Sequence, residues 1–210
     1  KPSVISAICK YHLTERMRQV VNDSMDVHGG KGVMLGPNNY LGRGYQGVPV
    51  SITVEGANIL TRNMMIFGQG AMRCHPYLKD MVDLIHSNES SADKEFNKVL
   101  RKTVGFSVKN AFRSFGKGYL PFLRGSESAL PEVRKYEKRV NSISAKLAPL
   151  ADLSLAVLGG DLKKAELLSA RLGDVMSYLY GAMAAIRFYE QRIEDRKLAL
   201  PYFEYAMQGS

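Results

Sequence analysis

Cysteine is scarce in this chain of 210 residues, which contains only Cys9 and Cys74. Their separation gives no Cys-x-x-Cys pair, and no His/Cys spacing around them resembles a structural zinc site. A disulfide-stapled secreted fold is therefore excluded, and a reducing compartment is expected. We predict a cytoplasmic protein with no metal site.

Long apolar runs are also absent. No run approaches the ~20 residues that a helix needs to cross a bilayer, and no signal peptide opens the chain. Hydrophobic residues make up 45% and charged residues 23%. These proportions are typical of globular proteins, so intrinsic disorder is not expected. Because Lys1 stands directly before an apolar helical pattern, we expect the chain to be part of a longer protein.

Acidic residues are outnumbered by basic ones, 20 Asp+Glu against 29 Lys+Arg, which gives a net charge of +9. The polar stretch at residues 86–91 predicts a linker between two regions, 1–89 and 90–210. The first region carries a net charge of +2 and the second +7. No nucleic-acid-binding signature accompanies these charges, so no nucleic acid is expected. Helical spacing favours a solvated basic face, with peripheral docking to an anionic inner membrane or to an acidic partner as alternatives.

The periodicity of apolar residues predicts an all-α fold, a helical bundle followed by an appended helical hairpin. The glycines and prolines between Gly29 and Pro49 predict a long ordered loop. Ser3 is a plausible N-cap of the first helix, Pro131 suits the first turn of a long helix, and Asp161 is the predicted N-cap of the next. The predicted helices cover residues 3–27, 56–68, 76–85, 92–115, 131–158 and 162–194.

Apolar stripes on the two long helices of the hairpin are interpreted as core rather than as a binding groove. On the later helix the stripe contains Leu168, Leu172, Val175, Leu179 and Met183, and on the earlier one Ile143, Leu147, Leu150 and Leu153.

One apparent motif is rejected. Residues 42–47 read Gly-x-Gly-x-x-Gly, the fingerprint of a dinucleotide-binding turn. No apolar strand precedes it, and Pro49 falls where the helix of that motif should begin, so we do not expect a nucleotide there.

A single carboxylate carries the strongest hint of chemistry. Glu55 lies in an apolar stretch, immediately before Gly56 and a predicted helix. Burial of a carboxylate raises its pKa and makes it a usable base, and a glycine beside it lets a substrate approach the backbone closely. The alternative is a carboxylate that only caps the next helix.

Two motifs in this order resemble the C-terminal signature of the flavin-dependent acyl-CoA dehydrogenases. They read MDVHGGKG at residues 25–32 and ITVEGANILTR at residues 52–62, with Arg43 in the segment between them. The forms look most like the long bacterial acyl-CoA dehydrogenases of fatty-acid β-oxidation, which carry an additional helical C-terminal region. Residues 90–210 resemble that region, so the likeness covers essentially the whole chain.

The resemblance implies a function for the first region. Glu55 takes the place of the catalytic base, which removes the α proton of a fatty acyl-CoA while a hydride leaves the β carbon for FAD. Gly56 matches the glycine beside the thioester carbonyl of the substrate. Gly29 and Gly30 match the turn that contacts the FAD of a neighbouring subunit, which implies a dimer or higher homo-oligomer. Asp26 stands where the family usually has a glutamine, and it can accept but not donate a hydrogen bond.

The resemblance also implies partners, and it leaves alternatives. It predicts a fatty acyl-CoA substrate and an electron-transfer flavoprotein-like acceptor, although an acyl-CoA oxidase would use the same base. Since the flavin-binding β domain of the family is absent from these residues, we expect the chain alone to be inactive. A non-catalytic helical module that docks to a membrane or a partner is the competing hypothesis, and Glu55-Gly56 is the feature that such a module does not need.

Overall fold

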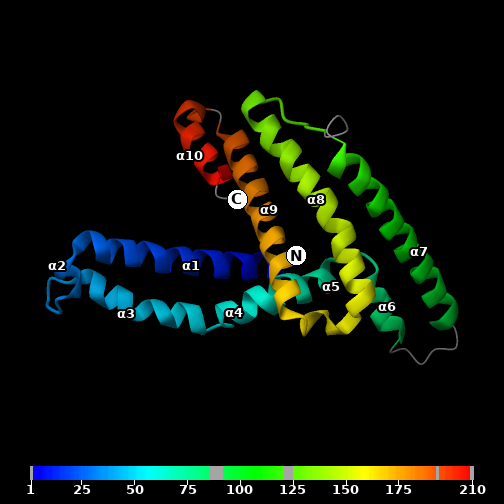
Figure 1. The fold of residues 1–210 in the computed structure, drawn as a ribbon, viewed down its shortest axis with the longest axis horizontal. Helices are drawn as coiled ribbons and strands as arrows, with labels where there is room; N and C mark the ends of the chain where they lie inside the picture. Colours follow the sequence, from blue (N-terminus) through cyan, green and yellow to red (C-terminus); the bar gives the residue numbers. More distant parts are fainter. Residues whose placement is uncertain (1, 86–91, 121–124, 193, 209–210) are drawn as a thin grey trace.

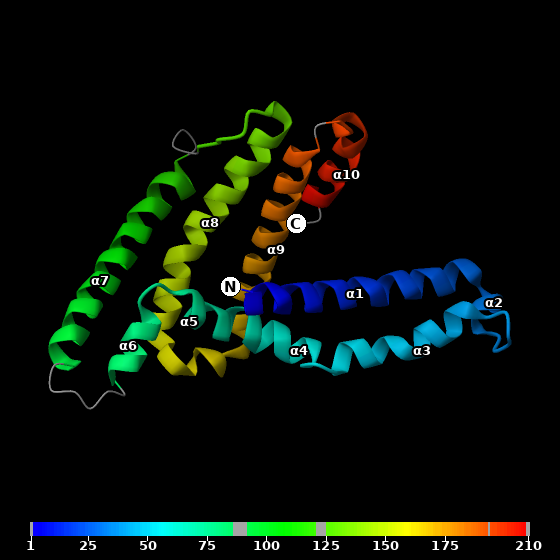
Figure 2. The ribbon, with the colours of Figure 1, turned by 180° about the vertical axis from the view of Figure 1, so that it is seen from behind.

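The structure is a computed structural model that describes residues 2–85, 92–120, 125–192 and 194–208. Within these ranges the chain forms helices and no strand, which confirms the all-α prediction. Figures 1 and 2 show a long two-helix arm projecting from a group of tilted helices. The predicted linker at residues 86–91 lies outside the described residues.

The arm is a helical hairpin. Helix α1 (Pro2–His28) runs outward, the short helix α2 (Gly30–Val33) forms the tip, and helix α3 (Tyr40–Thr53) returns beside α1 (Figure 1). Helix α1 begins at Pro2, so Ser3 is inside the helix and is not its N-cap. Only the inner end of α1 is well buried, through Val4, Ala7 and Ile8.

The prediction of a long loop between Gly29 and Pro49 is wrong, because most of that segment is helical. Asn39 caps α3, and its Oδ1 atom accepts a hydrogen bond of 2.7 Å from the Gly42 amide. The Asn39 Nδ2 group also donates to the carbonyls of Gly32 and Met34. Capping and packing of α3 against α1 thus outweigh the poor helix propensity of the glycines. The Gly-x-Gly-x-x-Gly run lies inside α3, which confirms that it is not a dinucleotide-binding turn.

A second helical stretch follows the arm. It consists of α4 (Asn58–Leu60), the π-helix η1 (Thr61–Gln69) and α5 (Gly70–Cys74), so it extends further than the predicted 56–68 helix. Helix α6 (Leu78–Ile85) confirms the short helix predicted at 76–85.

The remaining elements form the second group of helices. They are α7 (Ala92–Arg113), the π-helix η2 (Ser114–Tyr119), α8 (Pro131–Leu158), the 3₁₀-helix η4 (Gly159–Lys163), α9 (Glu166–Gln191) and α10 (Arg196–Gln208). Helices α8 and α9 form the predicted hairpin, and Pro131 occupies the first turn of α8 as expected. Asp161 is not the N-cap of α9, because η4 intervenes and Ala165 takes that position. Helix α10 was not predicted from the sequence.

The predicted core stripes of α8 and α9 are only partly correct. Leu172 is buried, but Met183 is 55% exposed and Leu153 is 59% exposed. The face of α9 that meets η1 is made largely of small residues instead, and it contains Ser169, Ala170, Gly173 and Ser177. Small side chains let the two backbones approach closely: a Cβ added at Gly173 would lie 3.3 Å from the Arg62 carbonyl oxygen. This contact joins the two regions of the chain.

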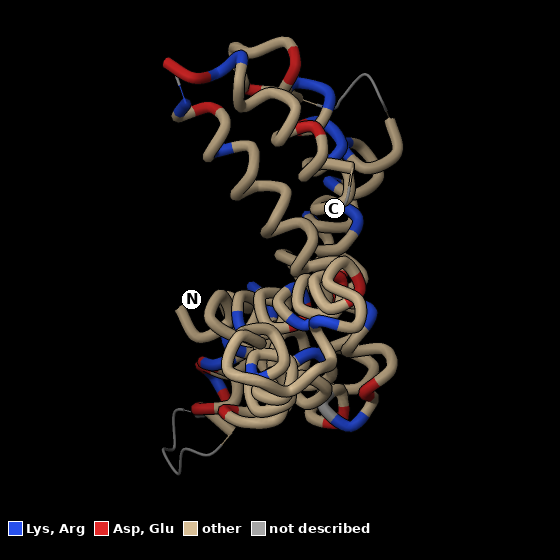
Figure 3. Tube along the Cα trace, turned by 90° about the vertical axis from the view of Figure 1, so that its left-hand side faces the viewer, with Lys and Arg blue, Asp and Glu red and all other residues tan. Residues whose placement is uncertain are grey.

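One segment of the described residues, Pro131–Leu162, is long and apolar enough to cross a membrane by length and composition, with a mean hydropathy of 1.3 in its best window. This corrects the expectation that no segment approaches that length. Only 6% of that window is buried, so α8 is not a buried core helix, although it packs against η2, α9 and α7. Figure 3 shows acidic residues interspersed among the Lys and Arg residues of the helices.

Candidate functional site

The junction between α3 and α4 places the predicted base in an unusual backbone conformation. Glu55 has φ 56°, and it is the one non-glycine residue with a positive φ within the described part of the chain. Gly56 follows with φ 83°. A non-glycine residue in the left-handed region costs about 1–3 kcal/mol and persists only where its surroundings enforce it. Glu55 and Gly56 therefore form a strained turn between two helices.

The Glu55 side chain is not where the sequence predicted it. It is exposed, so the expected burial in an apolar setting is not found in this chain. The capping alternative is not found either, because Ala57 is the N-cap of α4 and no side chain caps that helix. Glu55 presents an exposed carboxylate from a turn whose backbone is held by other residues.

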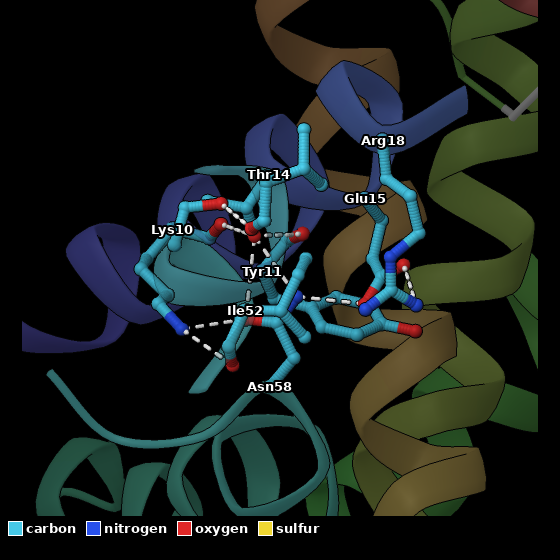
Figure 4. A network of polar contacts seen from close by, with 9 residues as sticks. Lys10, Tyr11, Thr14, Glu15, Arg18, Ile52 and Asn58 are labelled. Carbon is cyan, nitrogen blue, oxygen red and sulfur yellow. Dashed lines mark hydrogen bonds and ion pairs between the residues drawn. The ribbon is translucent and has the colours of Figure 1, made fainter. Parts of the chain in front are cut away.

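Lys10 of α1 is the main residue that holds this turn (Figure 4). Its Nζ atom donates hydrogen bonds to the Gly56 carbonyl at 2.8 Å and to Asn58 Oδ1 at 2.6 Å. A longer contact of 3.4 Å reaches the Ile52 carbonyl in the last turn of α3. The Thr61 hydroxyl donates a second hydrogen bond to the Gly56 carbonyl at 3.2 Å. The carbonyl of the residue after the predicted base is thus fixed by two donors.

Asn58 connects this turn to the middle of α1. It is 3% exposed, and its Nδ2 group donates to Thr14 Oγ1 at 2.9 Å and to Glu15 Oε1 at 2.7 Å. The Thr14 hydroxyl in turn donates to the Lys10 carbonyl at 2.7 Å. Both ends of the Asn58 amide are therefore satisfied, which a buried amide requires. We name Lys10, Thr14, Glu15, Asn58 and Thr61 the turn clamp.

The turn predicted to contact the flavin is at the other end of the arm. Gly29 has φ 55°, and a Cβ added at Gly29 or Gly30 would meet nothing within 4 Å. Asp26 is exposed and lines a groove of about 570 Å³ between α1, α2 and α3. Asn22, Met25, Gly32, Val33, Leu35, Gly42, Tyr45 and Gln46 complete the groove. Backbone without side-chain cover at this turn leaves room for a flat ligand to pack closely against it.

The structure does not bring the predicted flavin turn and the predicted base together. Helix α3 has 14 residues and separates them, a length of about 20 Å at 1.5 Å per residue. Glu55 and Gly56 are adjacent at one end of α3, whereas Asp26, Gly29 and Gly30 are grouped at the other (Figure 2).

Two partly buried histidines, His12 and His75, lie near these helices. Burial lowers the pKa of His75, although the Asp152 carboxylate 3.8 Å away partly opposes this. Burial and the nearby Arg16 guanidinium lower the pKa of His12. In the described part of the chain, no three His, Cys, Asp or Glu residues are placed to hold a metal ion.

Comparison with known families gives two adjacent matches, which meet near residue 70. Residues 1–68 match the C-terminal domain of acyl-CoA dehydrogenase, and residues 72–210 match the bacterial-type C-terminal region of acyl-CoA dehydrogenase. No solved structure gives a significant match. The two matches follow each other along nearly the whole chain, in the order that the sequence motifs predicted. The chain therefore belongs to the acyl-CoA dehydrogenase family, of which it carries the C-terminal helical part in its bacterial form.

Proposed function

We propose that this chain supplies the catalytic base of an enzyme that oxidises fatty acyl-CoA to trans-2-enoyl-CoA in fatty-acid β-oxidation. The observation that carries the proposal is the strained Glu55-Gly56 turn, with its exposed carboxylate and its clamped backbone. Backbone strain of this kind is concentrated at functional sites, where it places one side chain for the function. A helix-docking module would gain nothing from it.

The chemistry requires a base at the α carbon. The Glu55 carboxylate accepts the α proton, and the electron pair of that C–H bond forms the new double bond to the β carbon. Bound FAD would supply the acceptor for the hydride that leaves the β carbon. The Glu55 backbone N–H, by its position, polarises the thioester carbonyl and stabilises the charge that develops as the proton leaves. Gly56 lets that carbonyl approach the backbone.

The residues at the tip of the arm fit a flavin contact. Gly29 and Gly30 present open backbone, and the groove beside them has both polar and apolar walls. Asp26 would accept hydrogen bonds from the cofactor there. Because α3 separates this turn from Glu55, we propose that the turn serves the FAD of a neighbouring subunit.

The same geometry supports a homo-oligomer of at least two subunits. Three consecutive apolar residues beyond the flavin turn are unusually exposed: Val33 is 71%, Met34 66% and Leu35 77% exposed. We propose that a second copy covers them. In the full-length protein, Leu35→Glu should then shift the mass measured by light scattering toward the monomer, whereas the exposed Val157→Glu on α8 should not. An unchanged mass for Leu35→Glu would contradict this interface.

Helix α7 supports the peripheral membrane contact. Leu100, Val104, Val108 and Phe112 are exposed along one side of it, and Phe112 is 75% exposed. The exposed Phe115 follows in η2. Basic residues flank this apolar side, including Lys98, Arg101, Lys102 and Lys109. Basic amphipathic helices of this kind lie on anionic membranes. We propose that α7 docks on the cytoplasmic face of the inner membrane.

Vesicle co-sedimentation tests the membrane contact. The full-length protein should bind vesicles that contain phosphatidylglycerol at low salt, bind less at high salt, and ignore vesicles of phosphatidylcholine alone. Phe112→Asp should weaken binding more than the same change at the exposed Tyr202 of α10. Equal binding to both lipids, or none at low salt, would remove the proposal.

The electron acceptor is proposed to be an electron-transfer flavoprotein-like protein. An oxidase would pass the same electrons to oxygen. Turnover of the full-length enzyme should therefore reduce such a flavoprotein under anaerobic conditions and release little hydrogen peroxide in air. Stoichiometric peroxide would favour the oxidase.

Replacement of Glu55 tests the function itself. In the full-length enzyme, Glu55→Gln should abolish oxidation of acyl-CoA and leave flavin content unchanged, because the amide keeps the size of the side chain but cannot take a proton. Near-normal turnover would overturn the assignment.

A further inference from the structure

We propose that Lys10 is a positioning residue for Glu55, and that its ammonium group fixes the direction of the base through the backbone of the turn. This inference rests on the proposed function. It assigns a role in the reaction to a residue on α1, 45 positions before the base.

The contacts of Lys10 are concentrated on one short segment. Its ammonium group has three N–H bonds, and its three acceptors are the carbonyls of Ile52 and Gly56 and the Asn58 side chain. These acceptors flank Glu55 on both sides in the sequence. One group therefore ties the end of α3 and the start of α4 to the same point on α1 (Figure 4). A charged donor makes stronger hydrogen bonds than a neutral one, so Lys10 is the strongest donor of the clamp.

The Gly56 carbonyl is the point at which the clamp controls the base. It belongs to the residue after Glu55, and Lys10 and Thr61 both donate to it. When both donors bind this oxygen, the orientation of the Gly56–Ala57 peptide is fixed. The backbone angles φ and ψ of Glu55 and Gly56 are then restricted to a smaller range. The Glu55 side chain makes no hydrogen bond or ion pair within the described residues, so the point and direction from which it extends depend on the backbone of the turn alone. Loss of the clamp therefore affects the reach of the carboxylate directly.

Proton transfer is sensitive to such a change. A misplacement of about 1 Å at a reacting group can cost on the order of 100-fold in rate. Substrate binding would be less affected, because most of its contacts do not depend on the direction of one carboxylate. A positioning role thus predicts a fall in kcat at nearly constant KM.

The test uses the full-length enzyme. Lys10→Met keeps the apolar stem of the side chain and removes the ammonium group. We expect kcat to fall on the order of 10- to 100-fold, with KM changed less than about twofold and flavin content unchanged. The α-deuterium kinetic isotope effect should rise as proton removal becomes slower. Lys10→Arg should recover a substantial part of kcat, and Lys79→Met, at an exposed lysine of α6, should resemble the wild type.

A second measurement does not depend on turnover. Hydrogen exchange of a peptide spanning residues 54–60 should be faster in Lys10→Met than in the wild type, and exchange in α9 should be unchanged. If Lys10→Met fails to fold, Thr61→Val removes the other donor to the Gly56 carbonyl and should lower kcat in the same direction. An unaltered kcat in a folded Lys10→Met enzyme, or a rise in KM alone, would overturn the proposal.

The outcomes separate this inference from the proposed function. An inactive Glu55→Gln enzyme with a normal Lys10→Met enzyme would retain the base and reject the clamp. An active Glu55→Gln enzyme would reject the base whatever Lys10 does.

Discussion

Arg62 of η1 and Asp174 of α9 are joined by two parallel hydrogen bonds, although 112 residues separate them in the sequence. The Arg62 Nε–Asp174 Oδ1 distance is 2.8 Å, and the Nη2–Oδ2 distance is 2.5 Å. The pair lies at the contact between η1 and α9, where the region that contains Glu55 meets the appended helices. Paired hydrogen bonds of this kind fix orientation as well as distance. The appended region thus helps to hold η1, which follows the Glu55-Gly56 turn and α4.

Loss of this pair should weaken the contact between the two regions. Because both side chains are about one third exposed, Arg62→Ala should lower the free energy of unfolding by only about 1 kcal/mol. Arg62→Lys should fall between Ala and wild type, since lysine cannot make both bonds at once. Chemical denaturation of the full-length protein measures both, with Arg73→Ala on α5 as the control. Additive effects of Arg62→Ala and Asp174→Ala in a double-mutant cycle would contradict a direct coupling.

Two glycines of α9 should respond differently to the same substitution. A Cβ at Gly173 would lie 3.3 Å from the Arg62 carbonyl, whereas one at Gly181 would meet nothing within 4 Å. Gly173→Val should therefore be less stable than Gly181→Val by about 1–3 kcal/mol, because overpacking acts only at the first site. Thermal or chemical denaturation of the two variants gives the difference. Equal stabilities would mean that α9 and η1 do not pack as closely as described.

Asn39 should control the tip of the arm. Asn39→Ala removes the N-cap of α3 and should cost about 1 kcal/mol, and it should speed hydrogen exchange in residues 30–42. Asn39→Asp keeps the cap and loses the bonds donated to Gly32 and Met34. Its effect should accordingly be confined to α2. The neighbouring exposed Asn38→Ala is the control, and a matching loss in that variant would argue against a specific cap.

Stability should fall as the pH drops from about 7.5 toward 5. His75 and His12 both have a folded-state pKa below the ordinary value of 6.5. As the pH falls through 6.5, the unfolded chain takes up protons first, so the stability present above that pH is lost. His75→Asn retains an acceptor for the amides of Tyr77 and Leu78 and does not titrate. The unfolding free energy of this variant, measured by denaturation at pH 7.5 and 5.5, should drop less between the two pH values than that of the wild type. An equal drop would show that His75 does not contribute to the pH dependence of stability.

The sequence was most informative where apolar periodicity and caps agree. Such signals predicted the hairpin of α8 and α9, the start of α8 at Pro131, and the short helix α6. Helix α3 does not, because its glycines and Pro49 predict a loop and only the Asn39 cap and packing on α1 reverse this. The core face of α9 was also not predicted. Two helices that pack closely require small residues at their contact, and a search for stripes of large apolar residues does not find them.

The candidate site was predictable in part. The motif around Glu55 predicts the base, but the exposure and the positive φ of Glu55 depend on how α3 ends and α4 begins. Lys10 and Asn58 were missed, since their contacts join residues more than 40 positions apart. The available signal was a single lysine within the apolar first half of α1. That lysine alone does not indicate which residues it contacts, because the contacts form only when the arm folds.

The most direct test of the central claim isolates removal of the α proton from oxidation. The full-length enzyme, with its flavin chemically reduced so that no hydride can be accepted, is incubated with acyl-CoA in D₂O. Mass spectrometry then follows deuterium at the α carbon. Wild-type enzyme and the exposed Glu194→Gln control should exchange this position, and Glu55→Gln should not. Exchange by Glu55→Gln at the wild-type rate would show that another group is the base.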